Sequence, residues 1–357
     1  MKKVNVAVVG ATGLVGSTML KVLEERNFPV DNLFVFSSKR SAGKKINFAG
    51  KEYTVEELTE DSFKDRDIKI ALFSAGGSVS ERFGPIAAEC GATVIDNSSA
   101  FRMHEDVPLV VPEINPEDIK ENKGIIANPN CSTIQSVLPL KPIHDKYGIK
   151  RVIYSTYQSV SGSGIKGISD LENGTKTAYK YEIQNNCIPQ IDVFLDNGYT
   201  KEEMKMINET KKILHDDMLV TATTVRVPVK NSHSISINVE TEKPFEIEDV
   251  KKIISDYEGL VLEDNPTEEV YPMPLHSANH DEVYVGRIRR DFTVDNGINL
   301  WSCADNIRKG AATNAVQIAE KLLEDWDESS TNGIWNCWYW SWRNTFWKER
   351  FSFTKRF

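Results

Sequence analysis

The sequence predicts an α/β protein in which a doubly wound parallel sheet is followed by a second, α+β domain with a mostly antiparallel sheet. Three observations predict it. A β-branched run at residues 4–9 leads through a glycine-rich turn into helical spacing at 17–26. Short apolar runs separated by helical or polar stretches follow, at 33–36, 68–73, 92–95 and 107–111. From Arg151 onward the runs alternate apolar and polar residues more strongly, as strands with one exposed face do, at 152–158, 219–229 and 234–240.

The amino-acid composition excludes several classes of protein. With 357 residues, 40% hydrophobic and 27% charged, it can bury the cores of two domains. The formal charge of -9 argues against nucleic acid or an anionic membrane surface as partner, so an anionic ligand would be held by local cations. Five widely spaced cysteines without a CxxC pair predict no disulfide framework and no metal site, and favour a reducing cytoplasm. The N-terminal apolar stretch is too short for a secretory signal or a membrane span.

Changes in pattern along the chain suggest its division into domains. We place the first domain at residues 1–130 and the second at 131–305, and we expect a helix at about 306–324 to pack back on the first. Residues 326–357 have a composition that is not normal for a globular domain. This tail holds six of the seven tryptophans, Trp326, Trp335, Trp338, Trp340, Trp342 and Trp347. We interpret it as an unselected extension; an amphipathic membrane-interface or partner-binding segment is the alternative.

The turn after the first strand contains Gly10, Gly13 and Gly16. This spacing departs by one residue from the G-x-G-x-x-G fingerprint, but it has the strand before it and the helix after it that the fingerprint requires. Glycines let the backbone approach a pyrophosphate, and the helix N-terminus directs N–H groups towards it. The turn therefore predicts a Rossmann-type dinucleotide site, with a plain tight turn as the alternative.

The end of the second strand indicates which dinucleotide binds. An NAD-preferring unit places Asp or Glu there to bind the ribose 2′-hydroxyl. Here the residues are Ser37, Ser38, Lys39, Arg40 and Ser41, with no acid among them. Hydroxyls and cations suit a 2′-phosphate, so NADP is favoured over a merely solvated basic loop.

One cysteine stands in a setting typical of a reactive thiol. Cys131 follows Asn128, Pro129 and Asn130 and precedes an apolar helical stretch, so it should lie at a helix N-terminus, where the dipole stabilises a thiolate. A lone cysteine is more often a small buried residue. We adopt that interpretation for the other cysteines outside the tail, Cys90, Cys187 and Cys303.

Several short blocks together carry a resemblance to a known family. They occur in a fixed order: the glycine turn, NSSAFR at 97–102, NCST at 130–133, QSVSG at 158–162, PQID at 189–192, EEMK at 202–205, RVPV at 226–229 with His233, and VGRIR at 285–289. In this order they resemble the aspartate-semialdehyde dehydrogenase family over residues 1 to about 324. Each block alone is weak evidence, whereas the combination is highly specific.

The resemblance implies roles for residues that spacing alone leaves open. Cys131 would be the nucleophile, His233 the acid/base, and Gln158 would orient the substrate. A second group would bind substrate and phosphate. Arg226 would hold the α-carboxylate through a bidentate pair, and Arg102 and Lys205 would bind phosphate. Glu202 would hold neighbouring cations, and Asn130 completes the set. Without the resemblance, a structural histidine is the alternative for His233, which follows a strand-like run, and a solvated helix pair is the alternative for Glu202 with Lys205.

The resemblance also implies the dinucleotide contacts and the assembly. The implied NADP contacts are Gly10, Thr12, Gly13, Leu14, Val15, Ser38, Arg40, Ser41, Ser161, Gly162 and Asn306. A homodimer or a dimer of dimers is expected. However, the segment between Gly162 and Pro189 is shorter than in many members, where it carries a dimer contact, so the dimer geometry is left open.

The implied activity is the NADP-dependent, reversible reductive dephosphorylation of L-4-aspartyl phosphate to L-aspartate 4-semialdehyde through a cysteine thioester, a step in diaminopimelate, lysine, threonine and methionine biosynthesis. Its small-molecule substrates would be aspartate semialdehyde and phosphate. Backbone N–H groups at the start of the Cys131 helix are expected to stabilise the oxyanion. One alternative is N-acetyl-glutamyl-phosphate reductase, against which Gln158 and the Glu202/Lys205 element argue. The other is a catalytically silent NADP-binding sensor with Cys131 as a redox switch.

Overall fold

The computed structural model describes the backbone of residues 2–331 and the side chains of residues 2–326. The chain forms two compact units. Among the described residues, the first contains 2–112, Pro116–Asn128 and 314–331, and the second contains Glu113–Asn115 and Pro129–Thr313. The short excursion at 113–115 belongs to the second unit because the buried Glu113 carboxylate accepts two hydrogen bonds from the buried Lys309 ammonium, both at 2.7 Å.

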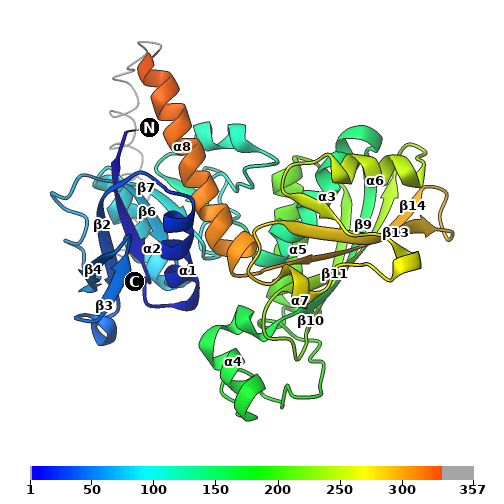
Figure 1. Ribbon diagram of the computed structural model, residues 1–357, viewed down its shortest axis with the longest axis horizontal. Helices are drawn as coiled ribbons and strands as arrows, with labels where there is room; N and C mark the ends of the chain where they lie inside the picture. The colour runs from blue at the N-terminus through cyan, green and yellow to red at the C-terminus, as the bar shows by residue number, and fades with distance from the viewer. Residues whose placement is uncertain (1, 332–357) are drawn as a thin grey trace. The chain divides into compact units, whose positions relative to one another are not determined.

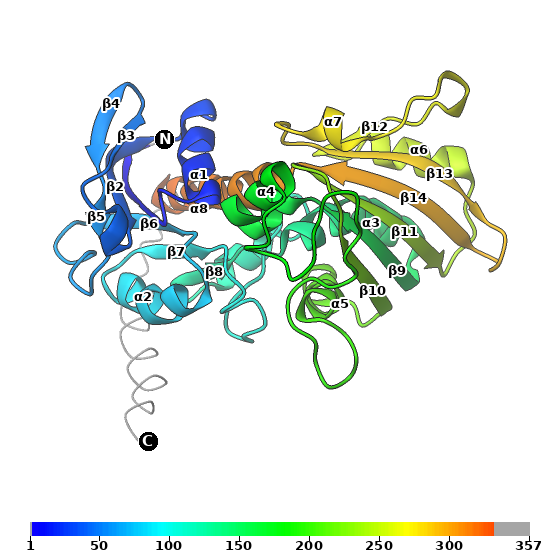
Figure 2. The ribbon, with the colours of Figure 1, turned by 90° about the horizontal axis from the view of Figure 1, so that it is seen from below.

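A parallel sheet forms the core of the first unit. Its strand order is β5-β2-β1-β6-β7-β8, and every pairing in it is parallel. The strands are β1 (Val4–Val9), β2 (Val30–Ser37), β5 (Glu56–Glu57), β6 (Ile68–Phe73), β7 (Thr93–Asp96) and β8 (Ile125–Ala127); β3 (Lys45–Phe48) and β4 (Lys51–Thr54) form a separate hairpin. The chain winds outward in both directions from β1 and β6, which puts α1 (Leu14–Glu25) and α2 (Gly77–Glu89) on opposite faces of the sheet (Figure 2).

One expected strand of this sheet is absent. The apolar run at 107–111 is buried, but it makes only an isolated bridge, between Leu109 and Ala127. Pro108 and Pro112 flank the segment's centre, and proline has no N–H with which to continue a ladder. The edge strand is instead β8, which the sequence analysis did not identify.

The C-terminal helical segment differs in its boundaries from the expectation of 306–324. Arg308–Ala312 is a single π-helical turn in the second unit, and α8 then runs as Thr313–Thr331. Hydrogen bonds tie α8 to the rest of the first unit: Asn314 donates to the Val110 carbonyl at 3.0 Å, and the Arg26 guanidinium donates to both carboxylate oxygens of Glu320. The helix thus extends into the Trp-rich tail and includes Trp326, whereas the other tail tryptophans lie outside the described residues.

The second unit is built on a six-stranded mixed sheet of order β10-β9-β11-β14-β13-β12 (Figure 1). Three of its pairings are antiparallel, and the two outermost, β10 with β9 and β12 with β13, are parallel. The strands are β9 (Ile149–Gln158), β10 (Leu219–Arg226), β11 (His233–Thr241), β12 (Leu260–Leu262), β13 (Val283–Asp291) and β14 (Gly297–Ala304). The fold class predicted from the sequence is confirmed for both sheets.

Helices cover one face of this sheet and leave the other open. In Figures 1 and 2, α3 (Cys131–Tyr147), α5 (Lys201–Leu214) and α6 (Ile247–Ser255) lie on the same face, while α4 (Gly164–Asn173) and α7 (Pro274–Ser277) lie at its periphery. The strands alternate buried residues towards the helices with partly exposed ones on the other face. That open face includes Tyr157, Leu219 and Trp301, and the rings of Tyr157 and Trp301 pack with centroids 5.3 Å apart.

Candidate active site

Cys131 is the first residue of α3, as the sequence predicts. Asn130 caps this helix, because its side-chain oxygen accepts from the N–H groups of Ser132 at 2.9 Å and Thr133 at 3.3 Å. Gly310 packs directly against the cysteine, since a Cβ at that position would lie 2.9 Å from the Cys131 Cβ. The N–H groups of Ser132 and Thr133 are therefore already engaged, which argues against the expectation that they stabilise an oxyanion.

The imidazole of His233 faces the thiol. His233 Nε2 lies 3.3 Å from Cys131 Sγ, although the two residues are 102 positions apart in the chain. His233 begins β11 and is fully buried, and Gln135 of α3 donates to its backbone oxygen at 3.0 Å. Burial, and secondarily the charge of Arg226, lower the pKa of His233 well below its usual value, which favours the neutral imidazole over the charged one.

A buried polar network lies behind His233. The Ser159 backbone N–H donates to His233 Nδ1 at 3.0 Å, and Ser159 Oγ is also 3.0 Å from Nδ1. Asn306 Oδ1 accepts from Ser159 Oγ at 3.0 Å, from Ser161 Oγ at 3.1 Å and from the Ser232 N–H at 3.0 Å. Ser161 and Asn306, which the resemblance assigns to the dinucleotide, are both buried members of this network next to the histidine.

Arg226 and Gln158 lie at the same end of the sheet as His233. They end the adjacent strands β10 and β9 and are register partners. Arg226 is buried, and its Nη1 donates to the Ser159 carbonyl at 2.6 Å, whereas its buried Nε has no hydrogen-bond partner in the described part of the chain. Gly162 makes room for this guanidinium, because a Cβ there would lie 2.9 Å from Arg226 Nη1. Gln158 is buried and donates to Thr156 Oγ1 at 3.3 Å.

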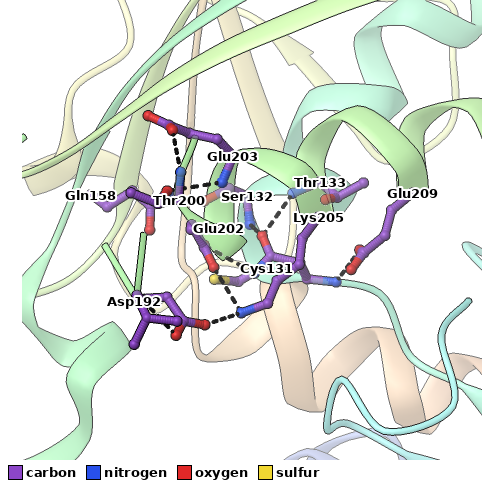
Figure 3. A network of polar contacts seen from close by, with 12 residues as sticks. Cys131, Ser132, Thr133, Gln158, Asp192, Thr200, Glu202, Glu203, Lys205 and Glu209 are labelled. Atoms are coloured by element: carbon purple, nitrogen blue, oxygen red, sulfur yellow. Dashed lines mark hydrogen bonds and ion pairs between the residues drawn. The ribbon is translucent and has the colours of Figure 1, made fainter. Parts of the chain in front are cut away.

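Helix α5 contributes carboxylates on the face that it turns towards Asn130. Glu202 accepts from Asn130 Nδ2 at 3.0 Å, and the buried Glu209 accepts from the Asn130 backbone N–H at 2.7 Å. Lys205 lies one turn after Glu202, and its ammonium lies between two carboxylates, 3.2 Å from Glu202 and 2.9 Å from Asp192 (Figure 3). Burial opposes the charge of Lys205, but the two carboxylates outweigh it and raise its pKa.

The glycine turn belongs to the first unit. Gly10 has a φ of 83°, and a Cβ there would lie 2.3 Å from the Ser74 carbonyl oxygen. A Cβ at Gly16 would lie 2.2 Å from the Gly10 oxygen, so both positions require glycine. Gly13 is the N-cap of α1, and Leu14 and Val15 are its first residues. A glycine-rich turn at a helix N-terminus fits a pyrophosphate.

The loop after β2 retains the features expected for a 2′-phosphate. Thr12 Oγ1 and Ser37 Oγ are 2.9 Å apart, which links the glycine turn to the end of β2. Ser38 and Arg40 are exposed, whereas Ser41 is buried. The exposed hydroxyl and guanidinium are available to an anion there.

Arg102 also lies in the first unit, where it is buried. Its Nε donates to the Asn128 carbonyl and its Nη2 to the Asn97 carbonyl, both at 2.9 Å. These bonds tie the 97–102 segment to the residues that follow β8. Arg102 thus supports the backbone of two loops, in addition to any role towards phosphate.

Sequence reasoning assigned no role to Ser159, Asp192 or Glu209. Ser159 and Asp192 both lie inside the blocks that carry the resemblance, so the blocks themselves were the available signal. Glu209 had only its spacing of seven residues from Glu202, which places both on one helix face.

Within the described residues, no group of three or more His, Cys, Asp or Glu is placed to hold a metal, and no helix is long and apolar enough to cross a membrane.

Comparison with known proteins identifies the family. A model of the semialdehyde dehydrogenase NAD binding domain matches residues 5–122, and one of the semialdehyde dehydrogenase dimerisation domain matches 140–309. Aspartate-semialdehyde dehydrogenase of Aquifex aeolicus is 57% identical over 335 residues, covering 90% of this chain and 98% of the relative. The chain belongs to the aspartate-semialdehyde dehydrogenase family. The resemblance inferred from the sequence blocks, and with it the dehydrogenase class, is confirmed.

Solved structures of aspartate-semialdehyde dehydrogenases share the fold. The Vibrio cholerae enzyme II, complexed with ASA, has a TM-score of 0.87 at 49% identity and covers 91% of this chain and 99% of that one. The Candida albicans enzyme with NADP has a TM-score of 0.72 at 26% identity and covers 90% and 98%. The first unit therefore carries the family's NAD binding domain.

Proposed function

We propose that this protein catalyses the reversible, NADP-dependent reductive dephosphorylation of L-4-aspartyl phosphate to L-aspartate 4-semialdehyde. The observation that carries the proposal is the pairing of Cys131 Sγ with His233 Nε2 at 3.3 Å at the N-terminus of α3. The match to a relative named aspartate-semialdehyde dehydrogenase, which covers 98% of that relative, also supports the proposal. We do not assign the chain to N-acetyl-glutamyl-phosphate reductases, because Gln158 and the Glu202/Lys205 element favour the first substrate.

The proposed chemistry passes through covalent states of Cys131. In the oxidative direction the thiolate attacks the aldehyde carbon and forms a thiohemiacetal. Loss of hydride converts it to a thioester, and a phosphate oxygen then attacks the thioester carbonyl and breaks the carbon–sulfur bond. The products are L-4-aspartyl phosphate and the regenerated thiolate. The reductive direction reverses these steps, and His233 is the proposed partner of the sulfur in both.

Substrate recognition is proposed to depend on buried charges around the thiol. Arg226 would hold the α-carboxylate, which its unpartnered Nε supports, since a buried donor without an acceptor is costly unless a ligand supplies one. Gln158, at the adjacent strand end, would orient the substrate. Glu202 would hold neighbouring cations in place, and Asn130 is a proposed contact of the substrate or phosphate. Lys205 would bind phosphate in the second unit, and Arg102 is proposed as a phosphate ligand from the first.

NADP is the proposed cofactor, and when bound it would supply the hydride acceptor or donor. Gly10, Thr12 and Gly13 with the first residues of α1, Leu14 and Val15, would hold the pyrophosphate. Ser38, Arg40 and Ser41 would hold the 2′-phosphate. Ser161, Gly162 and Asn306 remain proposed contacts from the second unit, although the buried hydrogen bonds of Ser161 and Asn306 give these two a second role.

A homodimer formed through the second unit is proposed as the minimal assembly. Its residues 140–309 match the family's dimerisation domain, and within the described residues α3, α5 and α6 cover only one face of its sheet. The partly exposed Tyr157 and Trp301 rings on the other face supply the kind of aromatic surface that interfaces bury.

A cytoplasmic location is proposed, and the presence of Cys90, Cys131, Cys187 and Cys303 as free thiols supports it.

An enzyme assay tests the proposal against its two alternatives. Aspartate semialdehyde, phosphate and NADP should together produce NADPH, and omission of phosphate should stop it. N-acetylglutamate semialdehyde in place of aspartate semialdehyde should give a much lower kcat/KM. Preference for the acetylated substrate would assign the protein to the reductases. NADP binding without turnover of either aldehyde would support the other alternative, a catalytically silent NADP-binding sensor.

A further inference from the structure

The buried guanidinium of Arg226 is contacted by an aromatic ring to which the proposed function gives no role. The Cζ atom of Arg226 lies over the ring of Tyr179, 5.9 Å from the ring centroid. An aromatic face attracts a cation without supplying a conventional hydrogen-bond acceptor. Nε of Arg226, which has no hydrogen-bond partner in the described part of the chain, therefore stays available to a ligand.

The position of Tyr179 is fixed at both ends of the residue. Its hydroxyl donates to Ser163 Oγ at 2.9 Å. Gly167 makes room for this hydroxyl, because a Cβ there would lie 2.8 Å from it. At the other end, the backbone N–H of Tyr179 donates to the Asp170 carboxylate at 3.3 Å. The ring therefore cannot turn away from Arg226 unless these contacts break.

Asp170 orders the segment that carries Tyr179. It is fully buried near the C-terminal end of α4. Its carboxylate accepts hydrogen bonds from the backbone N–H groups of Thr177 and Ala178, at distances between 2.8 and 3.0 Å. The hydroxyls of Thr175 and Thr177 donate to the same carboxylate, at 2.6 and 2.9 Å. Hydrogen bonds to a charged acceptor are strong, so this one side chain fixes residues 175–179.

The chain that follows Tyr179 also holds the backbone of Arg226. Tyr179 packs against a small hydrophobic cluster. The cluster consists of Val160, Ile183 and Ile188. Ile188 exchanges both backbone hydrogen bonds with Arg226, each at 2.9 Å. The stretch 179–188 therefore contacts Arg226 twice, at the guanidinium through the tyrosine ring and at the main chain through the isoleucine.

The guanidinium and the thiol face a common space beside Gly162. A Cβ on Gly162 would lie 2.9 Å from Arg226 Nη1 and 3.6 Å from His233 Nε2. The same imidazole nitrogen is 3.3 Å from Cys131 Sγ. Gly162 itself is exposed, so glycine leaves this space open. An anion that approaches the thiol therefore also comes close to the Arg226 charge.

We propose that Tyr179 is a positioning residue of the substrate site, whose ring covers the Arg226 guanidinium and holds it in the orientation in which it binds the substrate carboxylate. The ring also keeps water from that side of the cation, and a lower local dielectric strengthens its attraction for an anion. The inference rests on the proposed function, because it takes Arg226 as the carboxylate clamp. Tyr179 acts through Arg226 and needs no contact with the reacting atoms.

Alkylation of Cys131 in the full-length protein measures this role without turnover. Iodoacetate carries a carboxylate that the Arg226 charge attracts, whereas iodoacetamide is neutral and of similar size. Mass spectrometry quantifies the modified Cys131 peptide separately from the other cysteines. We expect Tyr179→Leu to lower the ratio of the iodoacetate rate to the iodoacetamide rate roughly threefold or more, and to keep the iodoacetamide rate within about twofold. An unchanged ratio overturns the proposal.

Two further variants separate the ring from its surroundings. Tyr179→Phe keeps the ring and loses the hydroxyl, and it should keep the ratio within about twofold of the unsubstituted protein. A loss as large as that of Tyr179→Leu would assign the effect to the Ser163 bond and contradict the ring. The matched control is Tyr181→Leu, which removes an exposed tyrosine of the same segment whose ring lies beside Lys180. If Tyr179→Leu does not fold, Tyr179→Met, which also lacks a ring, makes the same comparison.

Steady-state kinetics test the same role in the proposed reaction. Tyr179→Leu should raise the KM for aspartate semialdehyde roughly fivefold, with kcat and the KM for phosphate within about twofold, because the ring acts on carboxylate binding. Asp170→Asn should change the same KM in the same direction, since it weakens the anchor of residues 175–179. Its control is Glu172→Gln, the same charge change at an exposed residue of α4 that pairs with Lys230. A loss confined to kcat contradicts the positioning role.

The Arg226→Met variant distinguishes failure of this inference from failure of the proposed function. If Arg226→Met leaves the iodoacetate ratio unchanged, Arg226 does not attract the carboxylate, and the proposed function loses its clamp together with the inference. If Arg226→Met lowers the ratio and Tyr179→Leu does not, only the inference fails. In the Arg226→Met background, Tyr179→Leu should have no further effect on the ratio, because the ring acts through the guanidinium. A full additional loss in that background overturns the proposal.

Discussion

Arg226 donates from Nη1 to the backbone oxygen of Ser159 at 2.6 Å, and this one bond leaves the rest of its buried guanidinium to other acceptors. Its Nε has no hydrogen-bond partner among residues 2–326, whose side chains the structure describes. A buried donor without an acceptor costs free energy, which is offset when an anionic ligand supplies one. The geometry therefore supports Arg226 as the carboxylate clamp, and the bond to Ser159 couples that clamp to the residue that holds His233.

Replacing Arg226 with lysine should reduce kcat/KM for aspartate semialdehyde by roughly 10²-fold or more, because an ammonium cannot reproduce two parallel hydrogen bonds and misplaces the aldehyde. Steady-state kinetics measure this loss, and titration of the same variant with NADP measures cofactor binding, which should be spared. A near-normal kcat/KM, or an equal loss of NADP affinity, would show that Arg226 is not the clamp.

The Cys131→Ala substitution should abolish phosphate-dependent NADP reduction and leave NADP binding nearly unchanged. The nucleophile belongs to the second unit, whereas the glycine turn and the 2′-phosphate loop belong to the first. Activity is measured by absorbance of NADPH and binding by calorimetry. The control is Cys187→Ala, which removes an exposed cysteine. Activity of Cys131→Ala within tenfold of the unsubstituted protein would refute the role of nucleophile.

Asp192→Asn should lower the KM for phosphate by roughly two- to fivefold, because the carboxylate now competes with phosphate for the Lys205 ammonium across 2.9 Å in a partly exposed pair. The measurement varies phosphate at saturating aldehyde and NADP. Asp196→Asn is the matched control, since it makes the same charge change on the same exposed loop without an ion pair to Lys205. An unchanged or higher KM for phosphate would remove Lys205 from the proposed phosphate site.

Arg40→Ala should weaken NADP binding by roughly tenfold and affect NAD much less, because only NADP carries the 2′-phosphate that a charge-assisted hydrogen bond would hold. The ratio of the two dissociation constants is the measurement. Lys45→Ala removes another exposed cation from the same unit, one that pairs with Glu52, and should leave the ratio unchanged. Equal losses for both dinucleotides in Arg40→Ala would contradict the assignment.

Ending the chain after Thr331 should leave kcat/KM unchanged, because every residue of the proposed site lies before α8. The truncation point follows the structure, in which α8 continues to Thr331 and Asp325 lies 3.6 Å from Lys120. Kinetics and the yield of soluble protein are compared with the full chain. A truncated protein that folds but has lost its activity would show that the Trp-rich tail contributes to function.

The sequence by itself determined the local elements around the two proposed sites. The run at 4–9 and the helix after it leave room for only a short turn. Glycine at 10 and 16 indicates close approach to other backbone atoms, because a Cβ at these positions would lie 2.3 and 2.2 Å from a carbonyl oxygen. The run at 128–133 predicted that a helix begins at or near Cys131, and the cap by Asn130 that the structure adds is likewise a contact within one turn. These features depend on neighbours in the chain, so short patterns are sufficient to predict them.

Only the tertiary structure decided how distant residues meet. The pairing of β9 with β10 and β11 brings Gln158, Arg226 and His233 to one end of a sheet, and no local pattern specifies that register. The hydrogen bond from the Ser159 backbone N–H to His233 Nδ1 joins residues 74 positions apart in the chain, and the engagement of Lys205 by Asp192 depends on how the loop at 188–198 folds back on α5. Such contacts are fixed by packing and strand register across the whole unit, whereas sequence patterns report interactions within a few residues.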